Sequence, residues 1–164
     1  MIYAGPGRRL VGFIVDIVVL GAVGALLLPI LGVTAEEVLQ GTLPGDFVFS
    51  YLAVTAVYQI GFIVWRGQTP GKMAAKTKVV DEETGALPGP GPAAARWLIP
   101  AAGQFLPGVV SFVALFVTYG WLLRDPRRQG IHDKVARTVV VDTLLPLAPP
   151  DPMQRRDGDD PFLR

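Results

Sequence analysis

The chain has 164 residues, of which 51% are hydrophobic and 18% charged, and its net charge at pH 7 is +1. A mean hydropathy of +0.42, with the apolar residues gathered into blocks, is typical of a small membrane protein and gives no reason to expect a nucleic acid as partner. The absence of cysteine excludes disulfides and cysteine nucleophiles, and a single histidine is too few for a zinc site, so no metal or other cofactor is expected.

Three apolar segments are long enough to cross a hydrocarbon core of about 30 Å, which takes about 20 helical residues. Leu10–Val33 is interrupted only by Asp16, and residues 47–65 and 97–123 carry no charge. In lipid the backbone must bond within its own segment, so each segment is predicted to be helical. We therefore expect residues 1–145 to form an all-α polytopic transmembrane domain. A secretory signal is the alternative for the first segment, but its apolar run exceeds the usual ~7–15 residues.

Lysine and arginine set the expected orientation. Arg8 and Arg9 precede the first segment, the next loop is acidic, and residues 66–96 are again basic. This pattern predicts a multi-pass protein of the cell membrane with its amino terminus and the 66–96 loop in the cytoplasm.

The third segment leaves two topologies open. A single crossing would place the basic residues 124–137 outside, against the rule that basic loops stay in the cytoplasm. A break at Pro107-Gly108 would instead give two short arms, which form a re-entrant hairpin and return the chain to the cytoplasm. A kinked single crossing is the alternative, because proline is common in membrane helices.

Two β-branched runs, "TKVVD" and "RTVVVD", are predicted to pair as a small cytoplasmic sheet if the hairpin forms. That pairing would bring "TPGK" near "GIHDK", whereas a third crossing would separate them. Between the runs, Leu87–Ala95 ("LPGPGPAAA") has the composition of a linker. Residues 146–164 are rich in proline and mixed charge, which predicts a disordered tail.

The stretch "GQTPGK" invites comparison with a phosphate-binding loop, but that motif needs one more residue before Gly-Lys and a Ser or Thr after it. A turn from Thr69 to Lys72 fits better, since Pro70 fixes one dihedral and Gly71 permits a positive one. We expect Lys72 to lie at the anionic membrane surface, together with Lys76 and Lys78.

Catalysis is not expected. His132 and Asp133 are sequence neighbours, which on a strand point apart, and no serine or cysteine nucleophile has a recognisable partner. His132 is expected to supply a hydrogen bond or a charge near the membrane surface.

Asp16 is costly inside an apolar helix, and such residues usually face the protein interior and mark a functional site. Arg9 lies seven residues earlier on the same stripe of the helix, with Gly12 between them, so the two side chains are predicted to meet. Asp16 then either binds a cation or fixes helix packing through a hydrogen bond or an ion pair to the loop.

Three ordered motifs, "RRLVGFIVD", "GQTPGK" and "RRQGIHDKVARTVVV", resemble the RDD family of small integral membrane proteins. The resemblance covers nearly the whole chain except the last ~20 residues. It implies that the family's arginine and two aspartates correspond to Arg9, Asp16 and Asp133. The family's biochemical role is poorly defined, although ion transport has been proposed for some members.

Two functions remain. The first is a membrane scaffold or accessory subunit that associates with copies of itself or with other membrane proteins in the bilayer. The second is a small oligomeric transporter in which Asp16 binds Na⁺ or H⁺. One chain of this size offers few helices for a transport path, which favours the scaffold.

Overall fold

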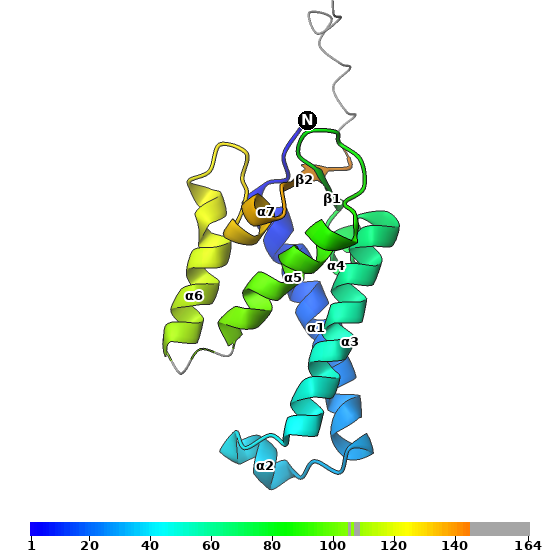
Figure 1. Ribbon diagram of the computed structural model, residues 1–164, viewed down its shortest axis with the longest axis vertical. Coiled ribbons are helices and arrows are strands. Elements are labelled where there is room, and N and C mark those ends of the chain that lie inside the picture. The colour runs from blue at the N-terminus through cyan, green and yellow to red at the C-terminus, as the bar shows by residue number, and fades with distance from the viewer. Residues whose placement is uncertain (105, 107–108, 145–164) are drawn as a thin grey trace, which may run out of the picture.

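The computed structural model describes residues 1–104, 106 and 109–144. Two long helices, α1 (Pro6–Ile30) and α3 (Gly45–Arg66), run antiparallel along it, and the short helix α2 (Ala35–Gln40) connects them at one end (Figure 1). At 1.5 Å per residue they are about 37 and 33 Å long, so both are long and apolar enough to cross a membrane. Few of their apolar side chains are buried, Phe47 and Ile63 in α3 and none in α1, which leaves an apolar surface for contact with lipid.

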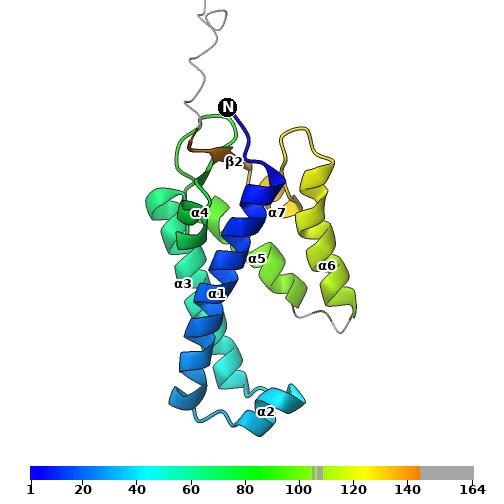
Figure 2. The same ribbon diagram turned by 180° about the vertical axis from the view of Figure 1, so that it is seen from behind.

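The third apolar segment is divided into two helices. α5 (Pro90–Gln104) and α6 (Val109–Gly120) run in opposite directions, and a 3₁₀ turn, η1 (Trp121–Leu123), follows α6 (Figures 1 and 2). At about 22 and 18 Å, both are shorter than the hydrocarbon core. The start of α5 and the end of α6 lie at the same end of the molecule, as the predicted hairpin requires, although Pro107 and Gly108 are outside the described residues.

One boundary prediction was wrong. Residues 87–95 were expected to be a linker, but α5 begins at Pro90 and includes the second half of that stretch. Prolines are compatible with the first turn of a helix, because the amide hydrogens they remove have no partner there. Pro100 also lies within α5 and does not end it.

The predicted sheet is confirmed. β1 (Thr77–Asp81) and β2 (Thr138–Asp142) pair antiparallel, with Val79 opposite Val140 at the centre. The amino terminus joins them, because the amide of Ala4 donates to the carbonyl of Val140 at 2.8 Å. We call this part of the molecule the sheet end.

Each strand follows a short helix. α4 (Pro70–Ala74) leads into β1 and α7 (Ile131–Val135) leads into β2, and each time one residue with positive φ makes the connection: Lys76 at 55° and Arg137 at 50°. α4 packs against α1 and β1, whereas α7 packs against α5, α6 and β2 (Figure 1).

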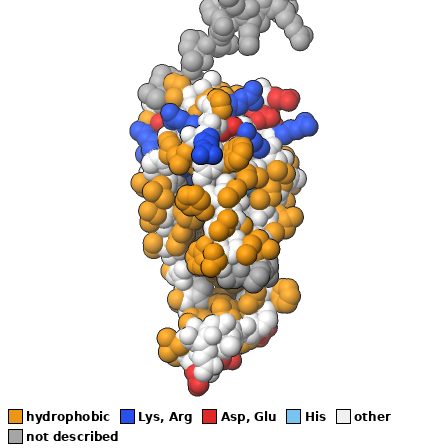
Figure 3. All heavy atoms as spheres, turned by 90° about the vertical axis from the view of Figure 1, so that its left-hand side faces the viewer, with side chains coloured by type: hydrophobic (Ala, Val, Ile, Leu, Met, Phe, Trp, Pro, Cys, Tyr) orange, Lys and Arg blue, Asp and Glu red, His pale blue; other side chains and the backbone are white. Residues whose placement is uncertain are grey.

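Charge is distributed unevenly along the molecule. Lysine and arginine gather at the sheet end, hydrophobic side chains cover the helices below it, and acidic side chains mark the opposite tip (Figure 3). The predicted disordered tail, residues 146–164, is outside the described residues.

Candidate functional site

A buried polar cluster lies where α1 meets the two short helices and the start of α5. Its charged and polar members come from five helices, α1, α3, α4, α5 and α7, and include every residue that the family resemblance pointed to. The cluster consists of Arg9, Asp16, Tyr58, Thr69, Lys72, Arg96, His132 and Asp133.

Asp16 is the centre of the first half of the cluster and is 3% exposed. Its Oδ1 accepts hydrogen bonds from the Tyr58 hydroxyl at 2.7 Å and the Gly71 amide at 2.9 Å. Its Oδ2 accepts from the Thr69 hydroxyl at 2.6 Å and lies 3.6 Å from Lys72 Nζ. Both carboxylate oxygens are therefore occupied by donors.

Two glycines allow α4 to reach Asp16. A Cβ on Gly71 would lie 2.1 Å from the carbonyl oxygen of Gly12 and 2.6 Å from Asp16 Cγ, so only glycine fits. Thr69 caps α4 by accepting from the Lys72 amide at 3.4 Å. The "TPGK" motif is thus a helix start that clamps α4 to α1.

This corrects the turn expected at Gly71. Gly71 is helical, and the positive φ needed to reverse the chain occurs four residues earlier, at Gly67, where φ is 70°. Gly67 ends α3 in the left-handed conformation that commonly follows a helix.

Lys72 was also misplaced by the sequence prediction. Instead of lying free at the membrane surface it faces Asp16, and its side chain is 20% exposed. Burial lowers the pKa of Lys72, and the negative charge of Asp16 opposes that shift. Lys76, by contrast, is exposed as expected.

Asp133 is the centre of the second half and is fully buried. Its Oδ2 accepts from Arg9 Nη2 and from the Gly130 amide, both at 2.9 Å, and its Oδ1 pairs with Arg96. Burial raises the pKa of this carboxyl, but Arg96 and Arg9 outweigh that effect and hold the pKa below its ordinary value. Asp133 therefore neutralises charge from two different helices.

Arg9 and Asp16 do not meet, contrary to the prediction from helix geometry. Arg9 points toward Asp133 and also donates to the carbonyl of Arg128 at 2.7 Å. The backbones of Gly12 and Gly71 touch in the space between the two side chains. Each side chain consequently has its own partners.

His132 is on helix α7, not on a strand, so it turns into the cluster beside Asp133 rather than away from it. Its Nε2 lies 3.4 Å from Asp133 Oδ1, and its ring packs against Tyr119 with 4.9 Å between centroids. Burial lowers the pKa of His132 to about 4, so the imidazole is neutral at pH 7. Its Nδ1 is buried and has no hydrogen-bond partner within the described residues.

Sequence reasoning missed two members of the cluster, Tyr58 and Arg96. Arg96 precedes a long uncharged segment, and a lone charge at that position is a signal that could have been weighted more heavily. Tyr58 has no comparable signal, because an aromatic residue with a hydroxyl is unremarkable in an apolar helix.

An internal repeat also escaped notice. Residues 66–81 and 127–142 share Arg, Gln, Ala, Thr and Val-Val-Asp in the same order and spacing. Both copies fold as a short helix followed by a strand, and the two glutamines make equivalent bonds: Gln68 donates to the Thr77 carbonyl at 2.9 Å and Gln129 to the Thr138 carbonyl at 3.0 Å.

The repeat carries opposite charges at its central position. Lys72 in the first copy faces Asp16 on α1, whereas the equivalent Asp133 in the second copy faces Arg96 on α5. The same local fold thus attaches two different helices to the sheet through ion pairs of reversed polarity.

The model of the RDD family matches residues 3–137. No curated protein and no solved structure matches the chain. The match spans both halves of the polar cluster, including the arginine at the start of α1 and the aspartate one third of the way along it. The chain belongs to the RDD family, and it is a membrane protein.

Proposed function

We propose that this protein is a non-catalytic membrane scaffold or accessory subunit, in which the polar cluster fixes the sheet to the helices. The observation that supports this role is the surroundings of Asp16. Two hydroxyls, one amide and one ammonium group are directed at its carboxylate. These contacts hold α1, α3 and α4 together.

A cation site needs the opposite surroundings. Na⁺ is a hard cation that takes several oxygen ligands, whereas Asp16 is ringed by donors and by the positive charge of Lys72 at 3.6 Å. Within residues 1–104, 106 and 109–144, no three His, Cys, Asp or Glu residues are grouped to hold a metal ion. These contacts favour a structural role for Asp16 over transport of Na⁺ or H⁺.

The experiment compares stability and flux in the same variants. Asp16→Asn should lower the stability of the purified protein by about 2 kcal/mol, because Lys72 loses its counter-charge in a partly buried site. Asp16→Asn with Lys72→Gln should recover about half of that loss. Asp16→Asn with Lys76→Gln is the matched control, since Lys76 is exposed, and should recover nothing.

In reconstituted vesicles the wild-type protein should show no flux driven by a Na⁺ or proton gradient. Gradient-coupled flux that disappears in Asp16→Asn, while the variant keeps its stability, would establish transport and overturn the scaffold proposal.

We also propose that the sheet end is cytoplasmic, supported by the concentration of lysine and arginine there (Figure 3). Single cysteines at the exposed positions Thr42, Glu83 and Thr143 test this. An impermeant thiol reagent should label only position 42 in intact cells, and all three positions after permeabilisation. Labelling of position 143 in intact cells contradicts the proposed topology.

A further inference from the structure

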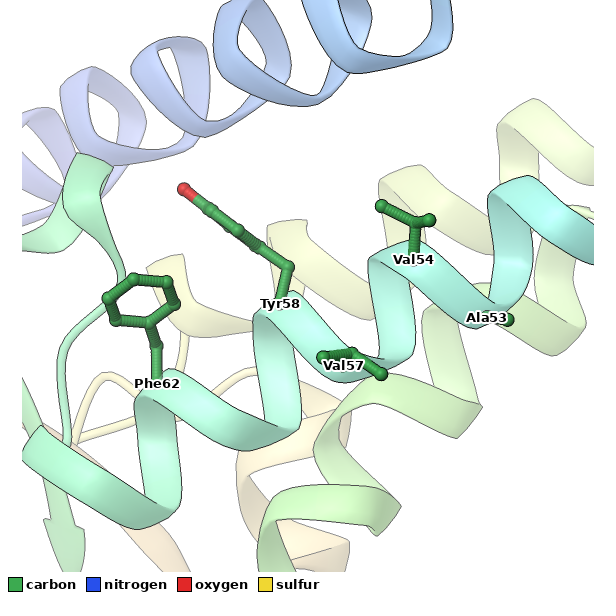
Figure 4. Close-up of a pocket in the computed structure, with 5 residues that line it drawn as sticks. All are labelled: Ala53, Val54, Val57, Tyr58 and Phe62. Carbon is green, nitrogen blue, oxygen red and sulfur yellow. The ribbon is translucent and has the colours of Figure 1, made fainter. Parts of the chain in front are cut away.

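A shallow groove of about 450 Å³ runs along one face of α3 (Figure 4). Its side chains are those of Ala53, Val54, Val57, Tyr58 and Phe62. The only polar group among these side chains is the Tyr58 hydroxyl, which is bonded to Asp16. The groove therefore offers a hydrocarbon surface without free hydrogen-bonding groups.

The length and position of the groove match one leaflet of a bilayer. Ala53 and Phe62 are nine residues apart on a helix, which is about 14 Å, close to half of a ~30 Å hydrocarbon core. Phe62 is one turn from the sheet end of α3, so the groove begins near the membrane surface and ends near the middle of the membrane.

A cationic residue, Arg66, lies one helical turn beyond Phe62, the groove residue nearest the sheet end. Arg66, the last residue of α3, follows Phe62 by four positions and so continues the same face. Its guanidinium lies 4.4 Å from the ring centroid of Trp65, and its Nη1 is 4.0 Å from the sulfur of Met73. Among the described residues no carboxylate pairs with it.

We propose that this groove binds one acyl chain of an anionic phospholipid from the leaflet at the sheet end, with the lipid phosphate on Arg66. A guanidinium presents several donors in a plane that suits phosphate oxygens, and among the described residues Arg66 makes one weak hydrogen bond, to the Met73 sulfur. Trp65 is 66% exposed beside it, as is common for tryptophan at the membrane surface. The proposal goes beyond the scaffold role. It requires only that α3 crosses the membrane and that its Arg66 end lies at the membrane surface.

Native mass spectrometry of the full chain in detergent, with equal amounts of phosphatidylglycerol and phosphatidylcholine, tests the proposal. The wild type should retain one phosphatidylglycerol in preference to phosphatidylcholine. Arg66→Gln should lower that retention about tenfold by removing a charge-assisted contact. Arg124→Gln is the matched control, because Arg124 is exposed just after η1, away from the groove, and should change retention little.

Filling the groove tests the acyl chain separately from the headgroup. Ala53 is exposed, so Ala53→Phe should fold normally, which its thermal midpoint checks, and should reduce retention of phosphatidylglycerol. Unchanged retention in Ala53→Phe, or displacement of the lipid by inorganic phosphate alone, overturns the acyl-chain site. Equal losses in Arg66→Gln and Arg124→Gln would show general charge attraction and overturn it as well. None of these variants touches Asp16 or Lys72, so the outcome is independent of the scaffold test.

Discussion

The close contact between α1 and α4 depends on the absence of a side chain at Gly71, and Gly71→Ala tests this dependence most directly. The added Cβ would lie 2.1 Å from the Gly12 carbonyl oxygen, 2.6 Å from Asp16 Cγ and 2.7 Å from Asp16 Oδ1. Because one of the obstructing atoms belongs to the backbone of a helix, no side-chain rotation relieves the clash.

The loss of stability in Gly71→Ala can be estimated from the contacts that break when α4 moves away from α1. Separating α4 from α1 lengthens the Gly71–Asp16 bond of 2.9 Å and the Thr69–Asp16 bond of 2.6 Å together. Overpacking usually costs about 1–3 kcal/mol, and each weakened bond to a buried carboxylate adds about 1.5–3 kcal/mol. We expect a total loss above ~3 kcal/mol, which reduces the ratio of folded to unfolded protein more than a hundredfold.

Two other glycines provide a graded comparison. Gly12→Ala places its Cβ 3.1 Å from the Gly71 carbonyl oxygen and 3.2 Å from Ala75 Cβ, so it should cost about 1–2 kcal/mol. Gly21→Ala, in the same helix, meets nothing within 4 Å and should be neutral or slightly stabilising. The measurements are abundance in the membrane and the thermal midpoint of the purified protein. If Gly71→Ala and Gly21→Ala behave alike, the close approach of the two helices is wrong.

His132, the only histidine, is buried in its neutral form, and its pKa is about 4 in place of the ordinary 6.5. As the pH falls, the unfolded chain therefore binds a proton at this residue before the folded protein does. The contribution of His132 to the free energy of unfolding should be fully present above pH 6.5 and should fall by about 3 kcal/mol as the pH drops to 4. Measured as the thermal midpoint against pH, this dependence should be weaker in His132→Gln. An unchanged dependence in that variant would exclude His132 as its source. Asp133→Asn should cost about 3–5 kcal/mol in chemical or thermal unfolding, because two arginines lose their shared counter-charge. Asp142→Asn, which removes the partner of the half-exposed Arg8, should cost at most about 1 kcal/mol, and similar losses in both variants would contradict the buried cluster.

The helices and the sheet were predictable because their signals are local. Apolar length predicted α1 and α3, and two runs of β-branched residues predicted β1 and β2 and their pairing. The exact limits of α5 were less accessible, because "PGP" is equally common in linkers and in the first turn of a helix. Only packing against neighbouring elements decides between these two uses.

The partners within the polar cluster could not be predicted in the same way. The cost of a buried charge identified Asp16 as important, but its ligands come from 42 to 55 positions away in the chain. Helix periodicity predicted that Asp16 would pair with Arg9, because it shows which residues lie on one face of a helix. It does not show that another element, here α4, packs against that face. The internal repeat is a signal that could have helped, because it places Lys72 and Asp133 at equivalent positions; in the structure Lys72 pairs with α1, and Asp133 pairs with both α1 and α5.

The amino terminus is held by the last strand: Ala4 and Ile2 bond to β2, and Arg8 pairs with Asp142. Because α1 ends at residue 30 and β2 at residue 142, synthesis at about 5–20 residues per second leaves α1 without this strand for roughly 6–22 s. Arg9, and Arg96 once it has been made, lack their counter-charge until Asp133 is added, so the nascent chain carries uncompensated charges that the finished protein buries. A chain that ended before residue 131 would keep α1 and α3 but lack α7 and β2, the two elements that bind Arg9 and the amino terminus.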